Sequence, residues 1–278
     1  MKKNVLSMLL DKMHRQYALN MERRLYLNWF NPLVTIYFNL RLLPFKDAVR
    51  LPIFVYGWPR VLSLYGKAEV GGGKIGRIKL NRNFHEAGAP ANMGGPEEFN
   101  IWGTIVFKGK CQIGTGGKIT VGDCGKLILG DDSKIMSQCN ITAYKFVTIG
   151  NSFLMAHRSQ IFDTGYHYVA DFREHKVKRL ASPISIGNNC WQCNSSTIMG
   201  GVILPDCTII ASKSLVNKNL SDLPEESIIG GSPAKLIATG YRLVQNKAMC
   251  RIIGSFFTSE PDASEYIFSK DINHDDFS

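Results

Sequence analysis

A period of six residues runs through positions 186–216 of the sequence. Cut into sixes, this stretch reads IGNNCW, QCNSST, IMGGVI, LPDCTI and IASKSL, followed by Val216. The first position of each six is a branched aliphatic residue in every case but Gln192, and the fifth is small or medium-sized. A helix repeats its apolar face every 3.6 residues and a strand every 2, so neither explains this period. The pattern predicts a chain that coils as three short strands per turn and buries one continuous core.

Shorter runs of the same period come earlier in the chain, at Leu129, Ile135 and Ile141 and again at Ile149, Met155 and Ile161. The phase is lost after Asp163 and returns at Ile184, and an interruption of this length is too long for a corner between strands. We expect residues 164–183 to project from the coil as an arm. The sequence thus predicts a mainly β chain with a coil over 64–237, between a helical, basic and aromatic segment over 1–63 and a helix and tail over 238–278. The closing helix is expected within 236–250.

The N-terminal segment is basic and aromatic. Up to Lys67 it holds eleven lysines and arginines against three acidic residues, which contributes to the net charge of +10. Apolar residues recur near helical spacing up to about residue 30, and the aromatic run that follows contains no apolar stretch of 18 residues, so a transmembrane helix is not expected. Two interpretations remain open and are compatible: a cap on the open end of the coil, and contact with an anionic membrane surface.

Composition narrows the functional classes further. The seven cysteines include Cys190 and Cys193 in a C-x-x-C spacing, but no second pair or histidine cluster accompanies them, which argues against zinc or redox chemistry. Reduced thiols and the lack of a recognisable cleavable signal favour a cytoplasmic location. The sequence contains neither a Walker loop nor a nucleic-acid recognition fold, so the positive charge does not indicate a nucleic-acid partner.

The hexads and the run IIGGSPAKLI that starts at Ile228 resemble the hexapeptide-repeat acyltransferases. The resemblance implies a left-handed parallel β-helix, a homotrimer and acetyl-CoA as donor. The run NPLVTIYFNL…LPIFVYG is similar to the leader of hexapeptide transferases found among surface-polysaccharide genes. Together these imply an O-acetyltransferase acting on a sugar hydroxyl of a cell-surface polysaccharide or its precursor, located in the cytoplasm or peripherally at the inner face of the membrane.

The resemblance also implies a catalytic role for His167, which ends the sequence Asp163-Thr164-Gly165-Tyr166-His167. A histidine at the mouth of the projecting loop acts as general base in this family, and an imidazole suits proton transfer near neutral pH. Asp163 either orients the imidazole or binds the acceptor hydroxyl, or else forms a turn where the chain leaves the coil. His157 and His175 raise zinc as a weak alternative, as in the γ-carbonic anhydrases that share the coil, but their spacing does not match, and no metal is expected.

Donor-binding residues are carried over from the later hexads. In the family they line a groove along the coil, and here the matching positions are Trp191, Asn194, Ser212, Asn217, Lys218 and Lys235. The two lysines match positions that contact phosphates of the nucleotide. Asn217 stands where the family usually has threonine, and Ala238 stands where a second basic residue is usual.

Three questions stay open at this point. Gln192 holds an inward position, so either the coil is irregular there or the register slides and Trp191 turns in. The two departures at Asn217 and Ala238 fit a non-catalytic scaffold or ligand-binding protein as an alternative function. One base and one groove also serve an amine, which leaves N-acetylation of an amino-sugar as a further alternative.

Overall fold

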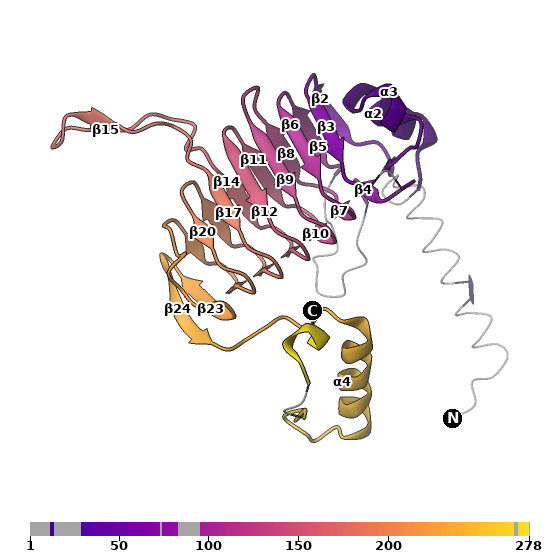
Figure 1. The fold of residues 1–278 in the computed structure, drawn as a ribbon, viewed down its shortest axis with the longest axis vertical. Coiled ribbons are helices and arrows are strands. Elements are labelled where there is room, and N and C mark those ends of the chain that lie inside the picture. The colour runs from indigo at the N-terminus through magenta and orange to yellow at the C-terminus, as the bar shows by residue number, and fades with distance from the viewer. Residues whose placement is uncertain (1–11, 14–28, 73, 83–94, 270–271, 278) are drawn as a thin grey trace.

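A computed structural model describes residues 12–13, 29–72, 74–82, 95–269 and 272–277. The helix expected before residue 30 falls mainly outside these ranges. Within them, three parallel sheets form the faces of a prism, and the chain visits each sheet in turn (Figure 1). The predicted fold class, a mainly β chain in a left-handed parallel β-helix of hexapeptide repeats, is confirmed.

The nine-strand sheet contains β1 (Ile53–Val55), β4 (Ile78–Leu80), β7 (Cys111–Ile113), β10 (Ser133–Ile135), β13 (Leu154–Met155), β18 (Trp191–Gln192), β21 (Ile209–Ile210), β23 (Ser227–Gly231) and β24 (Ala234–Thr239). The seven-strand sheet contains β2 (Arg60–Leu64), β5 (Glu98–Ile101), β8 (Lys118–Val121), β11 (Asn140–Ala143), β14 (Gln160–Phe162), β19 (Thr197–Met199) and β22 (Leu215–Val216). The six-strand sheet contains β3 (Lys67–Val70), β6 (Thr104–Phe107), β9 (Lys126–Leu129), β12 (Phe146–Ile149), β17 (Ile184–Ile186) and β20 (Ile203–Leu204).

The first position of each hexad points into the prism. In the seven-strand sheet, Ile141, Ile161, Ile198 and Val216 lie in register on successive coils, and all are buried. The fifth positions from Cys190 to Ser214 are buried as well. Stacking like residues at the strand spacing of about 4.8 Å makes the core continuous along the axis.

The first coil begins earlier than the sequence predicts. Strand β1 starts at Ile53, so the expected boundary at 63/64 falls inside the first coil. Ile53 and Val55 are buried on the inner side of β1, with the alternation of a strand. The aromatic residues of this stretch suggest a leader segment, but the alternation places it in the coil.

Helix α2 (Pro32–Leu42), followed by α3 (Phe45–Ala48), covers the open edge of β1. Its buried face carries Thr35 and Asn39, and these polar side chains hydrogen-bond to the strand backbone. The amide of Val55 donates to Thr35 Oγ1 over 2.9 Å, and Asn39 Nδ2 donates to the carbonyl oxygen of Ile53 over 2.6 Å. The cap satisfies backbone groups that an open sheet edge leaves unpaired.

The C-terminal end differs from the prediction of a helix over 236–250. Residues Ala234–Thr239 form β24, which pairs antiparallel with β23 and covers the last sheet edge. Gly240 then adopts φ +79°, a conformation that ends the strand. Helix α4 (Lys247–Ser259) begins after Asn246, whose side chain accepts from the amide of Ala248, and a 3₁₀ turn, η1, spans His274–Phe277.

Candidate functional site

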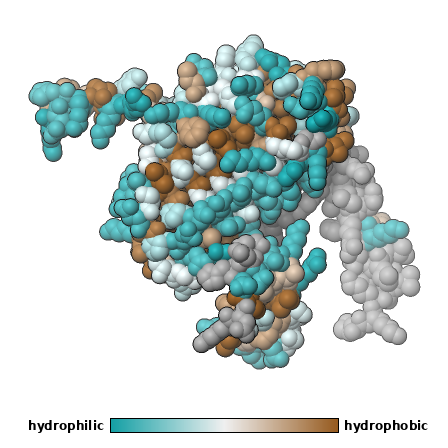
Figure 2. All heavy atoms as spheres, in the orientation of Figure 1, coloured by the Kyte–Doolittle hydropathy of each residue, from teal (hydrophilic) through white to brown (hydrophobic). Residues whose placement is uncertain are grey.

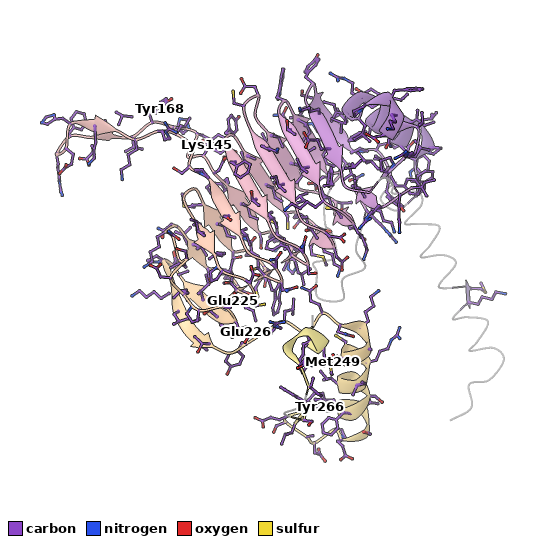
Figure 3. All side chains as sticks on the ribbon, in the orientation of Figure 1. Lys145, Tyr168, Glu225, Glu226, Met249 and Tyr266 are labelled. Atoms are coloured by element: carbon purple, nitrogen blue, oxygen red, sulfur yellow. The ribbon has the colours of Figure 1, made fainter. Side chains whose placement is uncertain are left out.

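The interruption in the hexads forms an arm that leaves the prism between β14 and β17 (Figure 1). Its two strands, β15 (Ala170–Asp171) and β16 (Lys176–Val177), pair antiparallel, and Thr164 bridges to Ala181 at the root. Figure 3 shows Lys145 where the arm leaves the coil and Tyr168 farther along it. The arm is therefore an ordered β-hairpin set on a corner of the coil.

Asp163 fixes the root of the arm. Its carboxylate is buried and accepts three backbone hydrogen bonds from the preceding coil: from the amide of Tyr144 over 2.8 Å, of Lys145 over 2.7 Å and of Phe146 over 3.0 Å. Among the described residues, His167 is not one of its partners. The geometry supports the turn-forming interpretation of Asp163, because both carboxylate oxygens already accept hydrogen bonds from backbone amides at the corner.

Tyr166 ties the arm to the coil a second time. Its hydroxyl lies 3.0 Å from Thr142 Oγ1 on β11, and its ring meets that of Tyr144 edge-on with centroids 5.9 Å apart. Sequence reasoning missed this anchor, since the pairing partner lies more than twenty residues away. The anchor holds the chain one residue before His167.

His167 itself is exposed and lines a cavity of about 530 Å³ on the arm. Its other walls include Lys176, Lys178 and Arg179 with one carboxylate, Asp171, and Lys176 also pairs with Glu174 over 3.4 Å. Sequence reasoning had not used these cations, although four basic residues lie between positions 173 and 179. The arrangement leaves the imidazole accessible to a ligand in basic surroundings.

A second cavity, of about 300 Å³, adjoins the first at the root of the arm. It is lined by Asp163, Met199, Gly200 and Asn217 along the corner and shares Gly165 and Leu180 with the cavity of His167. A Cβ on Gly200 would meet the carbonyl oxygen of Asp163 at 2.7 Å, so only glycine fits this corner. Asn217 therefore lies beside the root of the arm.

The remaining predicted donor residues lie elsewhere on the chain. Ser212 Oγ donates to Asn194 Oδ1 over 2.6 Å at the corner that precedes the seven-strand sheet, whereas Asp163 and Asn217 follow that sheet. A three-residue strand spans about 10 Å. Within one chain, Asn194 and Ser212 therefore lie together at one corner, and Asn217 lies with the arm at the next. The two corners are separated by the length of a strand.

Trp191 is half-buried on the outer side of the coil, whereas Lys218 and Lys235 lie at the surface. Trp191 points outward between Leu154 and Ile209 on neighbouring coils, while Lys218 and Lys235 are exposed. Gln192 points inward in register with Met155 and Ile210, and its amide nitrogen donates to the carbonyl oxygens of Gln160 and Ser196, each over 3.2 Å. The coil therefore keeps its register, and Trp191 does not turn in.

The cysteines show no sign of metal or redox chemistry in the described ranges. No disulfide joins any of the seven cysteines, all of which lie in the described ranges, and burial raises the pKa of Cys190 to about 12 and that of Cys193 to about 11. Thiols protonated at neutral pH are poor ligands and nucleophiles. Among the described residues, no three or more histidine, cysteine or acidic side chains are grouped so that they could hold a metal ion.

Two curated proteins are similar to part of this chain. The galactoside O-acetyltransferase of Escherichia coli (strain K12) is 32% identical over 91 residues, which cover 33% of this chain and 43% of that protein. The chloramphenicol acetyltransferase of Morganella morganii is 44% identical over 57 residues, which cover 20% of this chain and 26% of that protein. The chain therefore spans less than half the length of either relative.

Solved structures and family models complete the comparison. The structure of the polySia-specific acetyltransferase NeuO is 18% identical, with a TM-score of 0.46, over 78% of this chain and 94% of that chain. No family model matches the sequence. The chain thus resembles, in sequence over its matched segments and in its coiled hexads, the hexapeptide-repeat acetyltransferases.

Proposed function

We propose that the protein is an acetyl-CoA-dependent O-acetyltransferase that acts on a sugar hydroxyl of a cell-surface polysaccharide or its precursor. The observation that carries the proposal is the interruption of the hexads between Asp163 and Ile184, which presents His167 beside a corner cavity. The similarity to a galactoside O-acetyltransferase over 91 residues supports the reaction class.

In the proposed reaction, His167 removes the proton of the acceptor hydroxyl as the oxygen attacks the thioester carbonyl of the donor. The tetrahedral intermediate then collapses, the C–S bond breaks, and the sulfur leaves as the thiolate of CoA and takes up the proton. An ester and free CoA result. Asp163 acts on this reaction through the fold, since it holds the corner from which the arm carries His167.

Trp191, Asn194 and Ser212 would contact the donor along the coil, and the exposed ammonium groups of Lys218 and Lys235 would meet its phosphates. Because one chain keeps Asn194 and Ser212 apart from the arm, we propose a homotrimer in which the arm of one subunit reaches the donor groove of its neighbour. The projection of the arm away from its own coil supports this arrangement.

The decisive experiment is mass spectrometry of surface glycans from cells with and without the gene. The proposal expects an acetyl ester on a sugar to disappear with the gene and to return with the wild-type copy. Loss of an N-linked acetyl group would favour the amino-sugar alternative. Unchanged glycans, together with no calorimetric binding of millimolar acetyl-CoA, would favour a non-catalytic scaffold.

We also propose that the cap helices rest on an anionic membrane surface at the cytoplasmic side. Within the described residues, no helix combines the length and the apolar character that crossing a bilayer requires. Helix α2 has an unusual distribution of side chains, however. Leu33, Ile36, Tyr37 and Leu40 share its outer face and are 45–72% exposed, whereas the polar Thr35 and Asn39 face inward.

This outer face continues into exposed Phe45 and Val49 on and after α3, and Figure 2 shows brown, hydrophobic spheres gathered at this end of the molecule. Arg41, Lys46 and Arg50 flank it and are exposed as well. Apolar side chains bordered by cations suit the boundary between anionic headgroups and acyl chains. A lipid-linked acceptor would then meet the enzyme at its own surface.

A further inference from the structure

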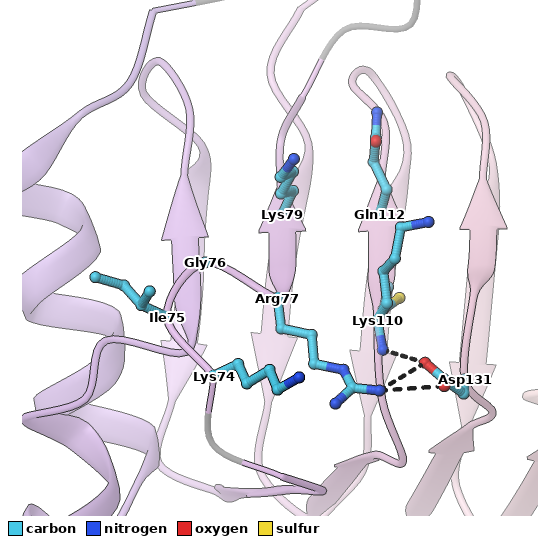
Figure 4. A pocket seen from close by; sticks show the side chains of 9 residues that line it. Lys74, Ile75, Gly76, Arg77, Lys79, Lys110, Gln112 and Asp131 are labelled. Carbon is cyan, nitrogen blue, oxygen red and sulfur yellow. Dashed lines mark hydrogen bonds and ion pairs between the residues drawn. The ribbon is translucent and has the colours of Figure 1, made fainter.

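A basic cavity lies on coils that precede the arm, on the outer side of the early strands β4 and β7. It has a volume of about 380 Å³ and is lined by Lys74, Arg77, Lys79 and Lys110, with Gln112, Ile75 and a single carboxylate, Asp131 (Figure 4). Four cations around one cavity with one carboxylate leave a local excess of positive charge.

Asp131 holds Arg77 in place. Arg77 Nη2 donates to both carboxylate oxygens, over 3.2 and 3.1 Å, and the backbone amides of Lys110 and Asp132 donate to Oδ1 over 2.5 and 2.9 Å. A Cβ on Gly109 would meet Oδ1 at 2.0 Å, so glycine is required for the carboxylate to sit there. Asp131 engages one end of the guanidinium group, and that contact orients its planar fork.

The other three cations of the cavity differ in whether a carboxylate pairs with them. The ammonium group of Lys110 pairs with Asp132 over 2.5 Å, whereas Lys74 and Lys79 have no hydrogen-bond or ion-pair partner among the described residues. Lys79 is half-buried on β4, in register with Gln112 on β7. Burial, then the charges of Arg82 and Lys110, lower the pKa of Lys79. The ammonium groups of Lys74 and Lys79, which lack a counter-ion among the described residues, lie near the other cations at a cost in free energy that a bound anion would recover.

We propose that this cavity is a binding site for a small phosphorylated ligand. A phosphate group carries up to two negative charges and accepts hydrogen bonds in several directions, which matches the unmatched ammonium groups of Lys74 and Lys79, the amide of Gln112 and the orientation of Arg77. The apolar side chain of Ile75 lines the same cavity and offers contact to the rest of the ligand.

The site is separate from the proposed acetyl-transfer site. It is built on β4 and β7, whereas the proposed donor residues lie between β18 and β24, several coils later. The inference therefore does not depend on the proposed function, and acetyl-CoA serves as a control ligand rather than as the probe.

The test is calorimetric titration of the full-length protein with inorganic pyrophosphate at low salt, comparing wild type, Lys79→Gln and Lys126→Gln. Lys126 lies on the six-strand sheet, away from the cavity, so its substitution removes one positive charge without touching the site. We expect saturable binding by wild type and Lys126→Gln, and binding weakened about tenfold by Lys79→Gln, the loss of one charge-assisted contact. Unchanged melting temperatures show that both variants are folded.

Four results would overturn the inference. The first is no saturable binding of millimolar pyrophosphate, and the second is equal weakening by both substitutions, which indicates general charge attraction. The third is a Lys79→Gln variant that weakens acetyl-CoA binding to the same extent, which would make the cavity part of the donor site. The fourth is a protein that binds a polyanionic polymer in the same titration but does not bind pyrophosphate, which would contradict a small-ligand site.

Discussion

The carboxylate of Asp163 accepts a hydrogen bond of 2.7 Å from the backbone amide of Lys145, so the exit of the arm is joined to the corner of the preceding coil. Two further amides complete the cradle. The position of His167 thus depends on hydrogen bonds between the buried Asp163 carboxylate and backbone amides, not on a contact between the side chains of Asp163 and His167.

Replacing Asp163 by asparagine should destabilise the protein. The amide side chain has one acceptor oxygen and directs an NH₂ group at donors, so at least one buried backbone amide loses its partner. We expect the free energy of unfolding to fall by about 2 kcal/mol, measured by chemical denaturation. Asp123→Asn is the matched control, because Asp123 is exposed and, among the described residues, accepts only from its neighbour's amide. Equal stability of the Asp163 variant and wild type would contradict the structural role.

Glu97 provides a pH-dependent test of the early coils. It is buried, one oxygen accepts from the amide of Gly117 over 2.7 Å, and the other has no hydrogen-bond partner among the described residues. Burial raises the pKa of Glu97 well above its ordinary value, and the charge of Glu98 adds to the increase. The folded state then holds the proton more tightly than the unfolded chain does.

The unfolding free energy should therefore fall as pH rises from about 4.5, the ordinary value, towards the raised pKa, and stay lower above it. Glu97→Gln should remove this contribution and be more stable than wild type at pH 7 by about 1 kcal/mol or more. Glu98→Gln, which loses ion pairs with Arg60 and Lys118, should instead reduce stability or leave it unchanged. A Glu97→Gln variant with the pH profile of wild type would rule out the shift.

The outer face of α2 predicts membrane binding that can be removed without unfolding the cap. The triple substitution Leu33→Ser, Ile36→Ser and Leu40→Ser changes only exposed side chains, so the hydrogen bonds of Thr35 and Asn39 to β1 remain. We expect sedimentation with vesicles containing anionic lipid to weaken at least about tenfold. The control Leu236→Ser with Ile237→Ser alters exposed apolar residues on β24 and should bind as wild type. Full binding by the triple variant would exclude this face.

The sequence predicted the parts of the fold that follow a period. Inward positions from Ile186 to Val216 are correct, because a coil repeats the same environment every six residues. The arm was predicted as an interruption, and its root at Asp163 lies where the hexads stop. Gln192 broke the pattern in sequence yet keeps its place, since two backbone carbonyls satisfy its amide nitrogen inside the coil.

Features that depend on distant pairing could not be read from the sequence. The strand at Ala234–Thr239 forms because β23 offers an open edge, although the closing helix was expected to begin at residue 236. The contact between Tyr166 and Thr142, and the inward polar face of α2, likewise exist only once strands from other coils are in place. The basic cavity at Lys79 joins residues of β4 and β7 with residues of the corners that precede β4, β7 and β10, so no single stretch of sequence predicts it.

The most direct test of the central proposal compares His167→Ala with His175→Asn in an acetyl-transfer assay. His175 lies on the same arm with φ +49°, a conformation that asparagine tolerates, so its substitution controls for disturbance of the arm. The account predicts that His167→Ala lowers kcat at least about a hundredfold with acetyl-CoA affinity retained, and that His175→Asn stays near wild type. Turnover by His167→Ala close to that of wild type would contradict the assignment of His167 as the base.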